Sequence, residues 1–211
     1  MNHAPSITIG RQVDQNAVES FLDLYRQSFA PLATRSAIRQ WFTDEEFRHE
    51  MASDTVVKFI GRDEHGRPCA LATLATELAT LPWINPTYYR HHFPDHYDRG
   101  VIYYISALVV RPDVQGGPWV RAMLHEIAGF IMNNRGMTAF DCCAYNVNEV
   151  GLPDLVTAIA REVAHVQIDE IDCQHYYGVT LSELPEDVID LRDQPAELHD
   201  EPELEHRIAD S

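Results

Sequence analysis

The 211-residue sequence predicts an α/β (α+β) fold: a mixed, mostly antiparallel sheet of six to seven strands with flanking helices. Residues 101–110 form a ten-residue apolar run, rich in branched and aromatic side chains, which is typical of a strand buried on both faces. Two apolar segments, 56–61 and 68–77, flank a short turn with Gly66 at its tip, the pattern of an antiparallel hairpin. After Pro118, apolar residues recur at helical spacing. Strands and amphipathic helices therefore alternate along the chain.

Alternating side chains, capping residues and a proline predict the elements before the hairpin. Residues 6–9 alternate polar and apolar side chains and predict a first strand. Asp14 or Asn16 is a suitable N-cap for the helix that follows, and Pro31 limits its end. Residues 36–51 predict a second helix with a broad apolar face. The hairpin comes next.

The central strand is followed by a turn, a helix and another strand. Pro112 ends the strand, and Pro118 is suited to the first position of a helix because its missing N–H would be unpaired there. Arg135 and Gly136 suit the end of that helix. Residues 137–146 predict a strand that a right-handed crossover would place parallel to the central one.

The last third of the chain predicts less regular structure. Residues 153–163 predict a helix, 166–172 alternate strictly and predict a strand, and 175–181 predict its partner or continuation. The 29 residues from Glu183 onward carry eleven acids and two arginines. We therefore expect one domain over residues 1–182 and a disordered acidic tail over 183–211.

Composition excludes several classes of function. An apolar fraction of 45% supports a packed core, while a formal net charge of -17 argues against nucleic acid as a partner. A charged leader and a run of eighteen apolar residues are both missing, so we expect no membrane association and a cytoplasmic protein. The four cysteines lack C-x-x-C spacing, which favours reduced thiols. A homodimer is compatible with the sequence.

The segment LVVRPDVQGGPWV resembles the acyl-CoA pyrophosphate loop of the GNAT superfamily of N-acyltransferases. Leu108, Val110, Pro112 and Gln115 match the pattern; its glycines fall on Pro118 and Val120, whereas the glycines of this chain are Gly116 and Gly117. The motif is thus degenerate. A strand that turns into a helix is in any case an anion-binding geometry. The resemblance implies coenzyme contacts from Leu108, Val109, Val110, Gln115, Gly116, Gly117, Pro118, Trp119, Val120 and, at the end of the next strand, Asn146.

The resemblance implies transfer of an acyl group from acetyl-CoA or another acyl-CoA to the amine of a small molecule or peptide, with no metal. Such transfer needs a donor for the carbonyl oxygen, a base for the ammonium and an acid for the thiolate. Backbone N–H groups near residues 108–110 would serve as donors if the central strand parts from its neighbour. Tyr145 and Ser106 are the candidate acid and base groups; ordinary packing in the core is the alternative interpretation for both.

Two other functions stay open. The first is a catalytically inactive protein of the same fold that binds a ligand or another protein, which the residues at positions 118 and 120 favour, as does the absence of the family's tyrosine from the helix 153–163. The second is an acyltransferase that uses an acyl carrier protein, which the acidity of the chain disfavours because carrier proteins are acidic too.

Residues 81–99 lack a periodic pattern and predict a loop with at most one helical turn. Aromatic and imidazole side chains are concentrated in residues 88–97. We interpret this segment as the rim or lid of an acceptor pocket. A metal site is the weaker alternative, because acidic or thiol ligands at familiar spacing are missing.

Overall fold

The structure is a computed structural model that describes residues 5–180. The chain divides into two units, Met1–Cys173 and Gln174–Ser211. Within the described part of the second unit, 174–180, no helix or strand is formed, and the hydroxyl of Tyr176 donates to Oε1 of Gln174 at 2.9 Å. The predicted domain end at 182 and the predicted acidic tail over 183–211 lie outside the described residues.

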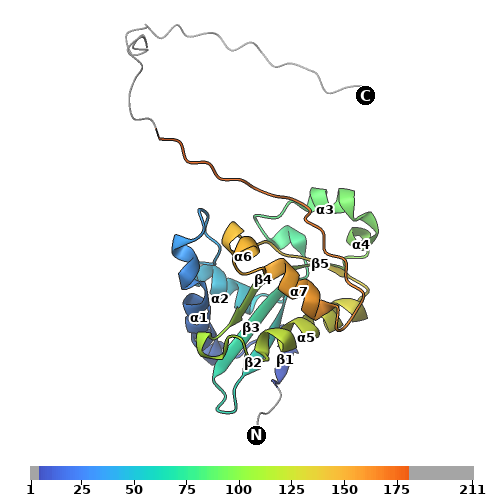
Figure 1. The fold of residues 1–211 in the computed structure, drawn as a ribbon. Helices are drawn as coiled ribbons and strands as arrows, with labels where there is room; N and C mark the ends of the chain where they lie inside the picture. Colours follow the sequence, from blue (N-terminus) through green and yellow to red (C-terminus); the bar gives the residue numbers. More distant parts are fainter. Residues whose placement is uncertain (1–4, 181–211) are drawn as a thin grey trace, which may run out of the picture. The chain divides into compact units, whose positions relative to one another are not determined.

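The first unit contains a five-stranded sheet in the order β1-β2-β3-β4-β5 (Figure 1). All neighbours pair antiparallel except β4 and β5, which are parallel. The predicted mixed, mostly antiparallel architecture is confirmed, but residues 5–180 supply five strands and not six to seven. The strands are β1 (Ile7–Gly10), β2 (Val56–Arg62), β3 (Pro68–Ala75), β4 (Ile102–Val110) and β5 (Met137–Ala139).

The β2–β3 hairpin is confirmed, and its turn shows why it forms. One carboxylate oxygen of Asp63 accepts the backbone N–H groups of His65 and Arg67, both at 3.0 Å. Gly66 has a φ of 75°, which an L side chain rarely adopts. β3 is buried along almost its whole length, so the hairpin places two strands in the middle of the core.

Two strand predictions were wrong, and a third, the strand parallel to β4, is confirmed only for its first three residues. The predicted strand 137–146 ends at Ala139, and residues 144–148 form a short helix, α6 (Ala144–Asn148). The segments 166–172 and 175–180 form no strand in the described chain although the first alternates strictly. Alternation specifies which side chains share a face, but a strand also needs an open neighbouring edge in register, which a local pattern does not encode.

Helices α1 (Gln15–Phe29) and α2 (Asp44–Ala52) cover one face of the sheet, joined by a 3₁₀ turn, η1 (Ala30–Thr34). The predicted cap of α1 is confirmed, because Asp14 accepts the backbone N–H of Asn16. The predicted start of the second helix at residue 36 is wrong. α2 begins after Thr43, where a capping box satisfies the first N–H groups of the helix.

Helix α5 (Trp119–Asn133) packs on the other face, and α7 (Leu152–Ala160) packs against α5 (Figure 1). Both predicted helices are confirmed, although Pro118 is the cap residue of α5 and not its first helical residue. Gly136 follows α5 where a Cβ would lie 2.6 Å from the ring of Tyr103. A glycine is therefore required where the chain turns back to the sheet.

The loop prediction for residues 81–99 was wrong. This region contains α3 (Pro86–His92) and α4 (Pro94–Asp98), preceded by a 3₁₀ turn, η2 (Leu78–Thr80). Each helix is too short to show a period but starts with a proline, and Asn85 caps α3 by accepting the N–H of Thr87 at 3.1 Å. None of the helices within residues 5–180 is long and apolar enough to cross a membrane.

Candidate functional site

The central strand β4 loses one of its neighbours about a third of the way along its length. β5 pairs with Ile102, Tyr103 and Tyr104 and ends at Ala139. β4 continues for six more residues, to Val110, with β3 on its other side. The edge of β4 from residue 105 to 110 is therefore not covered by β5, and we call it the free edge.

A β-bulge lies at the start of the free edge. Ala107 pairs with Thr73 and Ile105 pairs with Leu74, so Ser106 is an extra residue on β4. Ile105 packs with the core on the α5 side, whereas Ala107 packs with α1 and α2. The bulge thus changes which side chains face each helical layer, as bulges beside functional sites commonly do.

The free edge presents backbone donors. The N–H of Arg111 donates to the carbonyl of Cys69 on β3 at 2.8 Å. Because N–H groups alternate in direction along a strand, those of Leu108 and Val110 point to the free edge. The side-chain Nε2 of Gln115 donates to the carbonyl of Val110 at 3.2 Å, which closes the end of this edge.

The loop from β4 to α5 is held by its own bonds. It forms a 3₁₀ turn, η3 (Pro112–Val114), followed by Gly116 at a φ of 79° and by Gly117, whose N–H donates to the carbonyl of Val114 at 3.2 Å. The guanidinium of Arg111 binds Asp63 at 3.2 Å and Asp113 at 2.6 Å. Arg111, which follows β4 directly, is therefore already paired with two carboxylates.

The start of α5 keeps its first amides available. Pro118 caps the helix without a side-chain acceptor, so the N–H groups of Trp119, Val120 and Arg121 have no partner within the helix. The positive end of the helix dipole adds to them. A Cβ on Gly61 would lie 2.7 Å from the ring of Trp119, so this ring packs on β2 and fixes where α5 begins.

Tyr145 and Asn146 lie on helix α6 and not at the end of a strand, which corrects their predicted setting. The hydroxyl of Tyr145 accepts a hydrogen bond from Arg35 at 2.6 Å, and the guanidinium lies 4.3 Å from the ring centre. Arg35 follows η1, so this contact joins α6 to the segment between α1 and α2. The acid or base role of Tyr145 stays a prediction.

Sequence reasoning missed a tyrosine–carboxylate pair where β4 and β5 part. The hydroxyl of Tyr104 donates to Oδ1 of Asp141. Burial, together with the charge of Asp141, raises the pKa of Tyr104 far above its ordinary value. Asp141 is exposed and Tyr104 is buried. The two residues are far apart in sequence, so no local pattern indicates their contact.

A second group, of which the sequence predicted only Ser106, lies behind the bulge. Glu50 on α2 is 7% exposed, and its Oε1 is buried beside the hydroxyls of Thr73 and Ser106. None of these three oxygens completes a hydrogen bond of ordinary geometry. Glu50 comes three residues after the buried Phe47, so helical spacing would have indicated that it faces inward.

Burial dominates the electrostatics of this group. It raises the pKa of Glu50 above its ordinary value, although the Thr73 and Ser106 hydroxyls and the charge of Lys58 act in the opposite direction. Lys58 is fully buried, and burial lowers its pKa to about 8. Its Nζ donates to the backbone carbonyls of Arg11 and Ser53. The ammonium is thus held by backbone and not by Glu50.

The aromatic and imidazole side chains predicted to form a lid or rim lie on α3 and α4. The ring centres of His91 and His92 are 4.9 Å apart, and Tyr88 contacts His92 at 4.3 Å. Across residues 5–180 there is no group of three His, Cys, Asp or Glu side chains placed to hold a metal ion. The lid role stays a prediction. The cluster comprises Tyr88, Tyr89, His91, His92, His96 and Tyr97.

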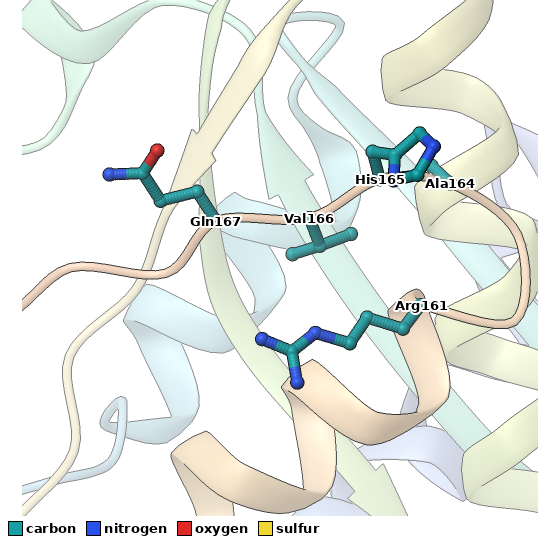
Figure 2. A pocket seen from close by; sticks show the side chains of 5 residues that line it. All are labelled: Arg161, Ala164, His165, Val166 and Gln167. Carbon is teal, nitrogen blue, oxygen red and sulfur yellow. The ribbon is translucent and has the colours of Figure 1, made fainter.

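Two surface hollows are lined by residues outside the central strand. One of about 640 Å³ is lined by Arg161 at the end of α7 and by residues 164–167 of the segment that follows, and Figure 2 shows the Arg161 side chain extending beneath Val166. Another of about 280 Å³ lies between α1 and the residues preceding α2, with Phe29 and Trp41 in its wall. β4 contributes no lining residue to either hollow. The free edge and the start of α5 therefore define the candidate site.

Comparison with known proteins supports the fold. The structure is similar to an aminoglycoside acetyltransferase from an uncultured soil metagenomic sample, with a TM-score of 0.51 and 13% identity over 85% of this chain and 99% of the other. It is also similar to aminoglycoside N-acetyltransferase AAC(6')-Iy in complex with CoA, with a TM-score of 0.50 and 13% identity over 85% and 98% of the two chains. No protein-family description matches the sequence, and neither does any curated protein. At this identity the likeness establishes that the chain has the GNAT N-acetyltransferase fold.

Proposed function

We propose that the protein transfers an acyl group from acetyl-CoA or another acyl-CoA to the amine of a small molecule or peptide. The observation that carries this proposal is the continuity of two sets of free backbone donors. The free edge of β4 runs through a short glycine loop into the uncapped start of α5. One set suits a thioester and its amide-containing arm, and the other suits a diphosphate.

The reaction assigns a separate task to each set of donors. The N–H groups of Leu108 and Val110 would bind the thioester carbonyl and stabilise the negative charge that develops on its oxygen. The amides of Trp119, Val120 and Arg121 would hold the diphosphate. The amine nitrogen forms a bond to the carbonyl carbon, and the bond from that carbon to sulfur breaks. Proximity of the two reactants supplies much of the rate.

The loop between β4 and α5 differs from the acyl-CoA pyrophosphate loop pattern in ways that lower the expected affinity for the coenzyme. Asp63 and Asp113 lie beside the loop and neutralise Arg111, and Pro118 has no N–H to offer a phosphate. We therefore expect the coenzyme to bind through main-chain groups, with little help from side-chain cations. The contributions of Val109 and Asn146 to coenzyme binding stay predictions. An acyl carrier protein as donor stays a hypothesis that the acidity of the chain disfavours.

A non-catalytic binding protein of the same fold is the second candidate. It is favoured by the engagement of two polar groups that a transferase would use, because Arg111 is paired with carboxylates and the hydroxyl of Tyr145 is bonded to Arg35. Such a protein would keep the fold and the free edge without turning over acyl-CoA.

Titration with acetyl-CoA, longer acyl-CoAs and free coenzyme A, followed by thermal shift and calorimetry, separates the two candidates. A transferase should be stabilised by about 2.7 kcal/mol at a hundredfold excess over the dissociation constant. Binding should be followed by acylation of at least one amine in a panel of primary amines and amino-terminal peptides. An unchanged melting temperature at millimolar concentrations of all these ligands would support the non-catalytic protein instead.

A further inference from the structure

Arg35 is an exposed cation without an acidic partner in a strongly acidic chain. Three other arginines between residues 26 and 48 each bind a carboxylate: Arg26 binds Asp44, Arg39 binds Glu46, and Arg48 binds Glu19. None of the ion pairs formed within residues 5–180 includes Arg35. Its charge is therefore available to an anionic ligand.

Tyr145 holds the guanidinium of Arg35 in a defined orientation. The tyrosine hydroxyl accepts a hydrogen bond from Nη1 at 2.6 Å, and the guanidinium carbon lies 4.3 Å from the ring centre. Nε and Nη2 form the edge of the guanidinium that binds a carboxylate through two parallel hydrogen bonds, and neither has a partner in the described part of the chain. Because Tyr145 already restricts the arginine, a ligand has less side-chain freedom to immobilise.

Two segments meet β4 at opposite ends of the free edge. On α1, Ser28 Oγ lies 3.4 Å from the carbonyl oxygen of Val110, the last residue of β4. Beyond the end of β5, Asp141 accepts a hydrogen bond from Tyr104, the last residue of β4 that pairs with β5. The first segment continues through η1, and the second continues into α6.

The contact between Arg35 and Tyr145 joins these two segments. Residues 28–35, 104–110 and 141–145 therefore form a closed circuit of chain and contacts, which we call the frame. One side of the frame is the free edge, where the proposed reaction places the thioester. An amine that attacks this thioester within the frame would have its remaining atoms near the side formed by Arg35 and Tyr145.

We propose that Arg35 binds a carboxylate of the acceptor, so that the acceptor is an amine that carries an acidic group, such as an amino acid or a short acidic peptide. The inference rests on the proposed acyl transfer. Arg35 determines specificity and takes no part in bond making, and Tyr145 positions it. A carboxylate fits better than a phosphate monoester, because the frame contains a single basic residue and a net charge of -17 disfavours a doubly charged ligand.

The test measures kcat/KM for matched pairs of acceptors with acetyl-CoA. Each pair is an ω-amino acid and its carboxamide, from glycine to aminohexanoate, so the members differ in charge but hardly in size. The series varies the distance between the amine and the carboxylate, and glycylaspartate with glycylasparagine extends it to peptides. In the best pair we expect the wild type to prefer the carboxylate by about tenfold or more, mainly through KM, because the contact is made before and during the reaction.

Variants assign this preference to residues. Arg35→Gln should abolish it, and Arg35→Lys should keep part of it because the charge stays while the two-pronged edge is lost. Tyr145→Phe should reduce it, since the ring stays while the hydrogen-bond acceptor is lost. The preference is a ratio measured on one variant, so a change in kcat that is common to both acceptors does not affect it.

Arg62→Gln is the matched control. Arg62 also stacks on an aromatic ring, with its guanidinium carbon 4.9 Å from the ring centre of Phe21, and it lies on β2, which β3 separates from β4. None of the ion pairs within residues 5–180 includes it. This variant should keep the wild-type preference.

Four kinetic results would overturn the inference. The first is equal kcat/KM for carboxylates and carboxamides in the wild type, and the second is a preference that survives in Arg35→Gln. The third is a loss in Arg62→Gln as large as that in Arg35→Gln, which would reflect overall charge. The fourth is a higher kcat/KM for aminoethyl phosphate than for any carboxylate, which would make the recognised group a phosphate.

A binding measurement separates failure of this inference from failure of the proposed function. The side-chain Nε–H resonance of Arg35 in the ¹⁵N-labelled protein is followed by NMR while each ω-amino acid or its carboxamide is added. If the wild type acylates no amine, the proposed function falls. A saturable shift with an ω-amino acid and none with its carboxamide would then still support a carboxylate site at Arg35, whereas an unmoved resonance would overturn the inference as well.

Discussion

The starts of helices α2 and α5 differ in what is available to bind their first backbone N–H groups. At α2, Thr43 Oγ1 accepts the N–H of Glu46 at 3.2 Å, and a carboxylate oxygen of Glu46 accepts the N–H of Thr43 at 2.6 Å. At α5, Pro118 offers no side-chain acceptor. One helix satisfies its first donors internally, and the other leaves them for an external anion.

This difference shows which structural features identify a ligand-binding site when its sequence motif is degenerate. Both helices follow the same backbone rules, and α2 even carries more acidic residues in its first turn. The start of α5 is distinguished by the strand it follows, because β4 ends there with an uncovered edge. Unused donors on two successive elements indicate a ligand more strongly than either alone.

The largest effect is expected from Gly61→Ala, which tests whether Trp119 fixes the start of α5. The new Cβ would lie 2.7 Å from the Trp119 ring and 3.0 Å from the Cβ of Ala70, so the ring must move. We expect a loss of about 2 kcal/mol in the free energy of unfolding, together with weaker coenzyme binding. Gly129→Ala is the control, since it adds a methyl group in the open on the same helix and should stabilise by about 0.5 kcal/mol. Equal melting curves for Gly61→Ala and wild type would refute the anchoring role.

Gly116→Val should weaken acetyl-CoA binding at least tenfold, because the residue needs a positive φ and the loop would be distorted. Gly66→Val is a matched control, since Gly66 has nearly the same φ and equally open surroundings at the tip of the β2–β3 hairpin. Both variants should lose similar stability by chemical denaturation. Only the first should change the calorimetric dissociation constant; an equal change in both would remove the loop from the site.

Thr43→Ala breaks the capping box of α2 and should lower the free energy of unfolding by about 1 kcal/mol. Because those donors serve only the helix itself, acetyl-CoA affinity should not change. Urea titration measures the free energy of unfolding, and calorimetry on the same preparation measures the acetyl-CoA dissociation constant. A parallel loss of affinity would show that the two helix starts are coupled, contrary to the comparison.

The smallest expected effect is the pH dependence of the stability that the Glu46 carboxylate contributes. Hydrogen bonds from Arg39 and from the Thr43 backbone lower the pKa of Glu46 to about 2. A depressed carboxyl pKa stabilises the fold above the unfolded value near 4.5, and that contribution is lost as pH falls toward 2. The stability difference between wild type and Glu46→Gln should therefore shrink across this window. A difference that stays constant from pH 5 to pH 2 would show that the carboxylate is not specifically held.

The parts of the molecule that were predictable from sequence are those encoded by consecutive residues. The run from β4 through Gly116 to α5 follows from local apolar spacing and turn residues, and so does the hairpin around Gly66. The contact of Tyr104 with Asp141 and the proximity of Glu50 to Ser106 join distant segments, so no local pattern contains them, although helical spacing does indicate that Glu50 faces inward.

The wrong predictions share a physical cause. The alternation in 137–146 and 166–172 describes side-chain faces but not the presence of a pairing edge. The two helices within 81–99 are too short for periodicity and are defined by proline starts. Tyr145 illustrates the consequence for sites, since its partner Arg35 lies 110 residues away.

The central claim is that acyl-CoA binds to the free edge of β4 and to the start of α5. Amide shifts in two-dimensional NMR spectra of the ¹⁵N-labelled protein, recorded while acetyl-CoA is added, test it most directly. We predict saturable shifts at Leu108, Val110 and Val120, with Phe47 in the first turn of α2 unchanged. Shifts that saturate elsewhere, while these three amides stay still, would contradict it.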